Sequence, residues 1–448
     1  MFCAGVNHMF FHGTAYSPKD AEWPGWKFYA SVDMSPTNSI WRDAPFLMSY
    51  ITRCQSFLQW GQPDNDFIVY LPVRDMWAKE KGQKLMQFDI HSMAKKAPEF
   101  ISSIMKIDSL GYDCDYISDR YILSTTCENG ILKTIGGAKY KALIIPGNNI
   151  MTPEVKAHLA ELEKQGAHII LGVNAKEMSL CAVPEQIKLQ TGMKMIRRSN
   201  PTGYHYFMSN LTPNDVDCDM PLATEFKDAA WFNPMNGDIN KATINNGKIR
   251  IRLRSGESAI LQTYRNGSPK EQINNEPVKQ SRQEIGLTKH KWQLSFIEEA
   301  PKVSKTFDLD SLQYWQNLDS ETSVTMGTGV YTTVVKLNTA QAKTHWNINL
   351  GDVRESARVY INGEFIGCAW AVPYILDCKN LLHKGNNVIR IEVTNLPANR
   401  ISDLDKKGVK WRKMKEINIV DLNYQKSTYA NWKLVDSGLN NVTLTTDY

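Results

Sequence analysis

The feature that most constrains the fold is a change of hydrophobic pattern near residue 196. Before it, continuous apolar runs alternate with stretches of helical character, which is typical of parallel strands covered on both faces. After it, short segments alternate apolar and polar residues one by one, which is typical of antiparallel sheets with a single buried face. One architecture cannot satisfy both patterns, so the 448 residues predict several domains, each with its own core.

The α/β pattern is clearest between residues 62 and 195. Three apolar runs predict its strands, at residues 67–71, 142–145 and 168–171. Before the last of them, Thr152 supplies an N-cap, Pro153 fits the first helical position, and Gly166 supplies a C-terminal stop. Strands joined by helices in this order predict a parallel, doubly wound sheet.

This α/β region lacks the motifs of nucleotide or amidotransferase chemistry. The sequence contains no glycine-rich phosphate-binding motif and no nucleophile elbow. Cys127 and Cys181 have no catalytic surroundings, so we interpret both as structural and the region as scaffold.

The second half of the chain predicts mostly strands. Residues 249–254 alternate cleanly within a small β region over residues 196–265. The polar stretch 266–283 predicts a linker. From residue 292 onward, many short alternating segments, with Asn362-Gly363 as a strong hairpin turn, predict a sandwich or jelly roll.

Composition excludes several classes of function. The net charge of +5 is spread along the chain without a block of like charges, which argues against nucleic-acid or membrane-surface binding. No apolar run reaches the length of a membrane span, and residues 1–8 do not resemble a signal peptide, so the chain as written is expected in the cytoplasm. The cysteines form neither zinc-ligand spacings nor a disulfide framework; they are Cys3, Cys54, Cys114, Cys127, Cys181, Cys218, Cys368 and Cys378.

The first 60 residues predict a strand over 2–11, a long loop over 16–44 and a helix over 45–60. A structureless loop of this length is usually functional or disordered. Together the three segments form one β/α unit, which cannot bury its own apolar faces and requires neighbours.

Side chains near this loop could bind a sugar. If residues 2–11 form a strand, His8, Phe10 and His12 face one way at its end. Asn, His and Tyr side chains there could hydrogen-bond hydroxyl groups, while Trp rings in the loop could stack on a ring. The alternative is that these side chains only pack the loop against its neighbours. The candidates are Asn7, His8, His12, Tyr16, Trp23, Trp26 and Tyr29.

Catalytic carboxylates are not evident in this stretch. Glycoside hydrolysis usually requires two carboxyl groups that flank the scissile bond. The available acids, all in the loop or at its edge, are Asp20, Glu22, Asp33 and Asp43. Loop carboxylates of this kind are more often solvated surface than catalysts.

A second set of candidates is predicted in loops of the final sandwich. These residues could touch a glycan or pack against a neighbouring domain: Trp370, Pro373, Tyr374, Asn399 and Arg400.

Several motifs also resemble a known family. Residues 12–18 followed by 22–30 resemble the last barrel strand and loop of glycoside hydrolase family 106, whose members are bacterial α-L-rhamnosidases. Residues 231–238 resemble a turn of the small β domain of such enzymes. The closing segment is similar to the sugar-binding, galactose-binding-like jelly roll of family 2 hydrolases, through residues 350–353, 357–363, 395–400 and 432–444.

The resemblance implies a domain order. Residues 1–61 would be the C-terminal end of a (β/α)8 catalytic barrel. Residues 62–195 would be a flavodoxin-like, class I amidotransferase-like α/β domain. Residues 196–283 would hold the small β domain and linker, and residues 284–448 the jelly roll.

The resemblance also implies an activity. Family members hydrolyse α-L-rhamnosides with inversion, using two glutamates and aided by calcium, and act at the cell surface or in the periplasm. Both glutamates would lie upstream of residue 1, and neither they nor the calcium ligands map onto residues here. The chain is therefore expected to be the C-terminal part of such a hydrolase, acting on a plant or bacterial glycan that contains rhamnose.

Different origins and functions remain open for this chain. It could be a truncated reading frame, a fragmentary gene, or a product that needs a separate N-terminal barrel fragment. The alternative function is a stand-alone carbohydrate-binding protein that uses the jelly roll. A third possibility is a non-functional fragment whose first 60 residues expose an unpaired apolar strand.

Overall fold

The computed structural model describes residues 1–12, 16–26, 34–79, 91–267, 283–411, 422–423 and 428–446. The chain divides into two compact units. Unit 1 comprises Met1–His8 and Arg53–Glu276, and unit 2 comprises Met9–Thr52 and Pro277–Tyr448. Helix α1 (Ala44–Leu58) contributes residues to both. Among the described helices, none is long and apolar enough to span a membrane.

Unit 1 contains the predicted parallel sheet. Its four strands lie in the order β3-β2-β7-β8, and every neighbouring pair is parallel. The strands are β2 (Phe67–Tyr70), β3 (Cys114–Ile117), β7 (Ala142–Ile145) and β8 (Ile169–Leu171). The central strands β2 and β7 are buried throughout, as their continuous apolar sequences predict.

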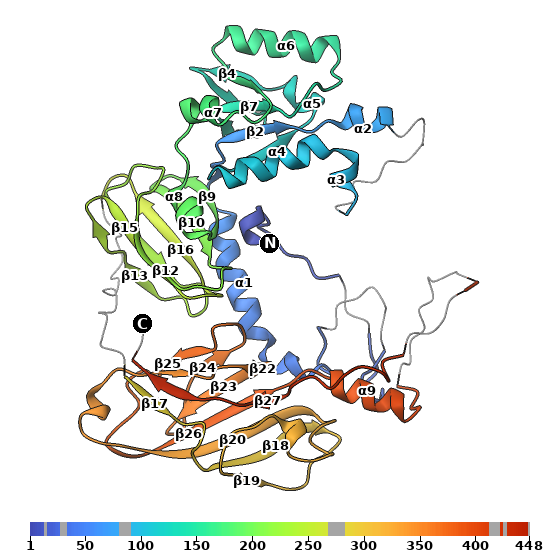
Figure 1. Ribbon diagram of the computed structural model, residues 1–448, viewed down its shortest axis with the longest axis vertical. Helices are drawn as coiled ribbons and strands as arrows, with labels where there is room; N and C mark the ends of the chain where they lie inside the picture. Colours follow the sequence, from blue (N-terminus) through green and yellow to red (C-terminus); the bar gives the residue numbers. More distant parts are fainter. Residues whose placement is uncertain are drawn as a thin grey trace. The chain divides into compact units, whose positions relative to one another are not determined.

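Helices cover both faces of this sheet (Figure 1). On one face, Phe67 and Val69 pack with α4 (Pro98–Ser109) and α7 (Ala175–Cys181). On the other face, Ile68 and Tyr70 pack with α5 (Asp119–Ile122) and α6 (Pro153–Lys164). The doubly wound arrangement is therefore confirmed. The predicted N-cap is confirmed as well, because the Thr152 hydroxyl accepts a hydrogen bond from the Val155 amide at 3.3 Å.

Shorter elements complete the α/β part of unit 1. The helices are α2 (Val73–Lys79), α3 (Met93–Lys96) and α8 (Gln186–Thr191). A small antiparallel sheet is formed by β4 (Thr126–Glu128), β5 (Ile131–Lys133) and β6 (Lys139–Tyr140).

The β part of unit 1 consists of two antiparallel sheets around a common core. The larger, in the order β1-β9-β10-β16-β12-β13, comprises β1 (Gln62–Pro63), β9 (Lys194–Asn200), β10 (Gly203–Ser209), β16 (Ser258–Tyr264), β12 (Asp228–Phe232) and β13 (Ile239–Lys241). The smaller comprises β11 (Val216–Met220), β15 (Lys248–Leu253) and β14 (Ile244–Asn245).

Two predictions for this β part are confirmed. In β15, Ile249, Ile251 and Leu253 face the core, as their alternation predicts. Residues 233–238 form the turn between β12 and β13, closed by a hydrogen bond from the Asn233 amide to the Asp238 carbonyl at 2.9 Å. The predicted linker lies largely at residues 268–282, outside the described residues.

Unit 2 is a β sandwich. One sheet, β19-β18-β20-β26-β23-β24, comprises β19 (Phe307–Leu309), β18 (Trp292–Ala300), β20 (Met326–Leu337), β26 (Gly385–Thr394), β23 (Ser356–Ile361) and β24 (Glu364–Ala369). The other, β17-β28-β21-β25, comprises β17 (Glu284–Gly286), β28 (Thr443–Thr445), β21 (Asn347–Asn349) and β25 (Ile375–Asp377). A two-stranded pair joins β22 (Val353–Arg354) to β27 (Gly438–Leu439).

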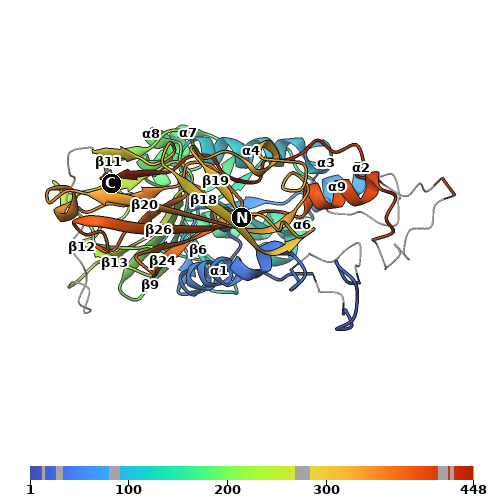
Figure 2. The same ribbon diagram turned by 90° about the horizontal axis from the view of Figure 1, so that it is seen from below.

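The core of unit 2 fills the space between its sheets. Its largest buried side chains are those of Trp292, Trp315 and Trp346. The long strands β20 and β26 run side by side over ten paired residues (Figure 2). The antiparallel sandwich predicted for the last segment is thus confirmed, and Asn362-Gly363 forms the turn between β23 and β24.

The N-terminal strand prediction is wrong. Within residues 1–12 the structure has a 3-10 helix at Phe2–Ala4 and no strand, and the described part of residues 1–61 contains no barrel strand. A strand needs a hydrogen-bonding neighbour, and the described residues offer none at this segment. The helix predicted at 45–60 is confirmed as α1, preceded by a 3-10 helix at Ser39–Asp43.

The loop predictions in unit 2 are partly right. Trp370, Pro373 and Tyr374 lie in the connection between β24 and β25, as predicted. Asn399 and Arg400 instead lie in helix α9 (Ala398–Lys406). Pro397 occupies the N-cap position of this helix, where it does not interrupt the hydrogen bonds of the helix interior.

Candidate functional site

The predicted site residues are divided between the two units. Asn7 and His8 belong to unit 1, where both are exposed, and the Asn7 carbonyl accepts a hydrogen bond from the Gln59 side chain at 2.7 Å. His12 is exposed in unit 2. Since residues 1–12 contain no strand, the predicted alignment of His8, Phe10 and His12 along a strand is wrong.

Tyr16 and Trp26 form an exposed aromatic pair in unit 2. Their ring centroids are 6.0 Å apart at an interplanar angle of 81°, and 74% of Tyr16 and 44% of Trp26 are exposed. The Trp26 amide donates a hydrogen bond to the Ser17 hydroxyl at 2.8 Å. The intervening turn requires glycine at Gly25, because φ is +81° and an added Cβ would lie 2.5 Å from that hydroxyl. Two open aromatic faces are therefore held beside each other by a constrained turn.

Trp23 precedes this pair's Trp26 by three residues, and its ring is held in one orientation by a hydrogen bond. Its indole nitrogen donates to the Thr37 carbonyl at 2.9 Å, and the Thr37 hydroxyl donates to the Pro24 carbonyl at 2.7 Å. The Trp23 ring lies 6.3 Å from the ring of Trp411, a residue that the sequence patterns did not single out. Tyr29 and Asp33, also named as candidates, lie outside the described residues.

A buried charge cluster holds the start of α1 against the outer face of the larger sheet of unit 2. Arg42 Nη2 lies 2.6 Å from Glu392 Oε2 in β26. Asp43 accepts hydrogen bonds from the Ser356 hydroxyl at 2.5 Å and from Arg358 Nε at 2.6 Å, both in β23. The Asp43 and Glu392 side chains are each 3% exposed. We call these five residues the Asp43 cluster.

This geometry decides the role of one candidate acid. Both carboxylate oxygens of Asp43 are engaged, one by Ser356 and the other by Arg358, so Asp43 anchors the chain and has no free oxygen for proton transfer. Asp20 and Glu22 are exposed on the loop.

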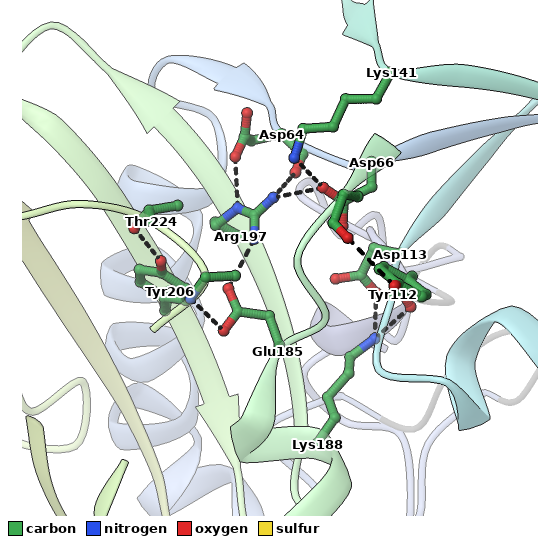
Figure 3. Close-up of polar contacts among 12 residues, drawn as sticks. Asp64, Asp66, Tyr112, Asp113, Lys141, Glu185, Lys188, Arg197, Tyr206 and Thr224 are labelled. Carbon is green, nitrogen blue, oxygen red and sulfur yellow. Dashed lines mark hydrogen bonds and ion pairs between the residues drawn. The ribbon is translucent and has the colours of Figure 1, made fainter. Parts of the chain in front are cut away.

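Unit 1 contains a second buried charge cluster, between the parallel sheet and the β part (Figure 3). Arg197, in β9, is 4% exposed and contacts three carboxylates. The distances are 2.5 Å from Nε to Asp64, 3.2 Å from Nη2 to Asp66, and 2.7 Å from Nη1 to Glu185. Lys141 approaches Asp66 at 2.8 Å. We call these residues the Arg197 cluster.

Lys188 continues the polar contacts on the same side of the sheet (Figure 3). Its ammonium lies 2.5 Å from Asp113, 3.1 Å from Asp108 and 3.0 Å from the Tyr112 carbonyl. Burial lowers the pKa of Lys188, but Asp113 and Asp108 outweigh it and the pKa is raised overall.

The electrostatics of the Arg197 cluster favour a structural role. Burial opposes the charge of Arg197, yet Asp66, Asp64 and Glu185 raise its pKa well above the ordinary value. A guanidinium with all three nitrogens paired to carboxylates cannot exchange a proton near neutral pH. Arg197 therefore fixes the two parts of unit 1 together and does not itself supply an acid or a base.

The cysteines do not supply a nucleophile. Burial raises the pKa of Cys3 to about 11 and of Cys114 to about 12, and it also raises the pKa of Cys181. The thiolate form is thus suppressed at each of these positions. The structural reading of Cys181 is supported, and Cys127 directs its thiol to the Gln165 carbonyl at 3.6 Å.

Across the part of the chain that the structure describes, no group of three or more His, Cys, Asp or Glu side chains is placed to hold a metal ion.

Sequence reasoning missed the Arg197 cluster, although one signal was available. Arg197 shares a face of its strand with Met195 and pairs across the sheet with Tyr206, so the alternation places a charge in an apolar row. Such an arginine must be paired. Its partners could not be read from the sequence, because Asp64 and Asp66 lie more than 130 residues away.

Comparison with known proteins connects this geometry to a family. Residues 1–192 match the family model for α-L-rhamnosidase. Residues 311–438 match the galactose-binding-like domain of glycosyl hydrolase family 2. Both matches confirm the resemblances found in the sequence, and the second covers most of the unit 2 sandwich.

A solved structure supports the fold of the whole chain. The rhamnosidase from Novosphingobium sp. PP1Y aligns with 99% of this chain, at a TM-score of 0.75 and 18% sequence identity. At that identity the likeness establishes the fold alone. This chain spans 45% of the solved rhamnosidase chain.

A curated relative is similar over a shorter stretch. A protein described as a putative β-glucuronidase of Formosa agariphila is 27% identical over 177 residues. That stretch is 39% of this chain and 13% of the relative. This chain therefore spans only a fraction of the proteins it matches.

Proposed function

We propose that this chain is the C-terminal part of a glycoside hydrolase that acts on α-L-rhamnosides. The observation that carries the proposal is the exposed Tyr16–Trp26 pair, which lies in the stretch that matches the α-L-rhamnosidase family. In this proposal the N-terminal segment supplies part of the active-site rim, and the remaining domains support it.

The rim would bind substrate through two kinds of contact. The open rings of Tyr16 and Trp26 can pack against the C–H face of a pyranose, and Trp23 is held in a fixed orientation beside the same turn. Within the same unit, the exposed His12 side chain can hydrogen-bond sugar hydroxyls.

The catalytic pair is proposed to come from sequence that precedes this rim. An inverting mechanism needs a carboxylic acid to protonate the leaving oxygen and a carboxylate to activate water on the opposite face. The engagement of Asp43 within its cluster supports this view, since it removes one of the acids available here. The rest of the barrel, in the same polypeptide or a separate one, would then be a partner of this segment.

Calcium belongs to the same proposal. We propose that any calcium is held mainly by the rest of the barrel or by the substrate, in keeping with the absence of a group of three or more His, Cys, Asp or Glu side chains placed for a metal among the described residues.

The test is release of the aryl group from an aryl α-L-rhamnoside. The purified chain is expected to be inactive alone and active when a polypeptide carrying the preceding barrel is added. Trp26→Ala is expected to lower activity of the assembled enzyme at least tenfold, whereas Trp77→Ala, a matched change at a 58% exposed tryptophan in α2, leaves it unchanged. Turnover by the chain alone would show that its own carboxylates perform the hydrolysis, and calcium chelation would then show whether the metal takes part.

A specific observation also favours the alternative, a carbohydrate-binding protein that uses the jelly roll. A hollow of about 690 Å³ lies over β18, β19 and β20 and is lined by Lys291, Gln293, Asp308, Asp310 and Thr332 among others. Its volume falls in the range of small-molecule sites. Within the described residues, the side chains of Gln293, Asp308 and Asp310 have no hydrogen-bond or ion-pair partner, so they are available to hydroxyl groups. Glycan binding without turnover that Gln293→Ala abolishes would support this function.

A further inference from the structure

Four aromatic side chains of unit 2 form a row that joins the N-terminal loop to the C-terminal segment. The row runs from Trp23 to Trp411, then to Tyr429 and Trp432. Successive ring centroids are 6.3, 6.3 and 4.5 Å apart, with interplanar angles of 32°, 37° and 46°. We call these four residues the aromatic row.

One carboxylate orders the C-terminal half of the row. Asp405, in α9, accepts a hydrogen bond from the Trp411 indole nitrogen at 2.6 Å and from the Tyr429 amide at 2.7 Å. It also accepts one from the Thr428 hydroxyl at 3.3 Å. At the other end, Trp23 is held by the Thr37 carbonyl. The Trp23 and Trp411 rings are therefore oriented by hydrogen bonds before any ligand arrives, which reduces the entropic cost of binding.

The row differs from the buried aromatics of the same unit. Trp292 and Trp315 are 2% and 0% exposed, and their indole nitrogens bond to groups inside the core. In contrast, 48% of Trp432 is exposed. The same segments also expose apolar side chains, with Val409 at 47%, Leu434 at 46% and Val435 at 42%. Exposed apolar side chains beside the row in sequence are consistent with a contact surface on these segments.

We propose that the aromatic row is a glycan-binding subsite, which holds sugar units of the substrate away from the bond that is cleaved. The inference rests on the proposed function, since it extends the surface to which Trp23 belongs. Pyranose rings would pack their C–H faces on Trp432, which is the exposed end of the row, and on the neighbouring Tyr429. Asp405 is a positioning residue, because its oxygens are taken up by the groups that orient the rings.

Chemistry favours a neutral sugar as the occupant. The partners of Asp405 are donors of this chain, so the carboxylate is not free to attract a cation. Aromatic faces offer large contact area at a low cost in side-chain entropy, which suits a ligand whose hydroxyl groups stay partly solvated. A protein surface packed on the row by the rest of a longer enzyme is the competing occupant, and the experiment below separates the two.

The experiment measures binding of the full chain to two probes by titration calorimetry. One probe is L-rhamnose, and the other is a rhamnose-containing oligosaccharide of at least four units. Trp432→Ala is expected to weaken the oligosaccharide about tenfold and the monosaccharide less than twofold, because the row contacts distant units. Trp432→Phe should restore most of the affinity by keeping an aromatic face. Trp41→Ala, at a 42% exposed tryptophan of unit 2 outside the row, is the matched control and should change neither.

Asp405→Asn tests the positioning role. The amide keeps the shape but can satisfy fewer of the three donors, so the oligosaccharide should bind about threefold to tenfold more weakly. The emission of the Trp411 indole should shift as well, while affinity for the monosaccharide stays the same. A general loss of folding would instead weaken both probes together.

The outcomes distinguish this inference from the proposed function. If Trp432→Ala and Tyr429→Ala bind the oligosaccharide like the unaltered chain while Tyr16→Ala and Trp26→Ala lose it, the aromatic row is not a subsite and the rim still is. Absence of oligosaccharide binding by the unaltered chain also overturns the inference, whereas turnover restored by an added barrel would leave the proposed function standing. If the added barrel alone covers the row, it would quench Trp432 emission without any glycan.

Discussion

Each of the two buried charge clusters links distant segments of one unit, but the positive and negative charges are arranged in opposite ways. In unit 1, a single cation, Arg197, sits among the three carboxylates of Asp64, Asp66 and Glu185. In unit 2, the buried carboxylates of Asp43 and Glu392 are each held by an arginine of the opposite segment. Both clusters tie distant parts of the chain together, and both leave their charged groups unavailable for catalysis.

The difference between the clusters lies in how completely each excludes water. Arg197, Asp66 and Glu185 are all nearly inaccessible, at 4%, 2% and 2% exposure. In the Asp43 cluster the arginines stay partly solvated, with 24% of the Arg358 side chain exposed. Breaking a buried pair is costly mainly because the remaining charge is left unsolvated. Removing a charge from the Arg197 cluster should therefore lower the free energy of unfolding more than removing one from the Asp43 cluster.

Arg197→Met is expected to have the largest effect. It leaves Glu185 buried without its cation and Asp66 with Lys141 as its only cation, which should destabilise unit 1 by about 3–5 kcal/mol. Hydrogen exchange followed by mass spectrometry checks this, with faster exchange expected in β9 and β10 and no change in β23 and β26. Lys164→Met, which removes an exposed pair with Glu161, is the control and should stay within about 0.5 kcal/mol. If hydrogen exchange became faster by the same factor in both units, the loss of stability would not be specific to the Arg197 cluster.

Acid provides a second test of unit 1 through His205. Its Nε2 lies 2.8 Å from the Phe57 carbonyl and must carry a hydrogen, so Nδ1 accepts from the Asn200 amide at 2.9 Å. Asn200 cannot turn its oxygen towards the ring, because that oxygen accepts from Thr202 and Gly203. Burial accordingly lowers the pKa of His205 to about 4.

The sign of the pH effect follows from that shift. A histidine with a lowered folded-state pKa stabilises the fold fully above its unfolded value of about 6.5, and this stability is lost as the pH falls towards 4. The loss should amount to about 3 kcal/mol. Urea unfolding of the wild-type chain at pH 7 and pH 4.5 measures it, and His205→Gln should flatten this part of the profile. An unchanged slope in that variant would assign the acid sensitivity to other groups.

Asp43→Asn is expected to have the smallest effect of the three. The amide can still accept from Ser356, and the partly exposed Arg358 can recover water, so unit 2 should lose about 2 kcal/mol. Exchange in β23 should rise, while exchange in β9 stays the same. A loss of stability as large as that of Arg197→Met would mean that the exposure of the arginine does not determine how much stability is lost when a cluster is broken. That result would overturn the physical basis of the comparison.

Two parts of the fold followed from local sequence. The strands β2, β7 and β8, helix α6 and the alternation of β15 were predictable because hydrophobic period and capping residues act within a few positions. The N-terminal segment shows where such reasoning fails. Residues 2–11 are apolar enough for a strand, but a strand also requires a pairing partner, which local sequence cannot supply.

The candidate site was predictable only in part. Tyr16, Trp23 and Trp26 were identifiable because tryptophan and tyrosine in a Pro- and Gly-rich loop suggest ring stacking. Trp411, Tyr429 and Trp432 were missed, because only folding brings Trp411 to Trp23 across 388 residues. By sequence alone Asp43 is an available acid, and only the structure places Ser356 and Arg358 against its carboxylate.

The sequence by itself determined the two kinds of sheet, the order of the elements and the family resemblance, since each depends on periodicity or on contiguous motifs. Only the tertiary structure decided which charges are buried and paired, that the Asp43 carboxylate is fully engaged, and that four distant aromatic rings form one row. Those properties depend on contacts between residues far apart in the chain, and such contacts are set by how whole faces pack.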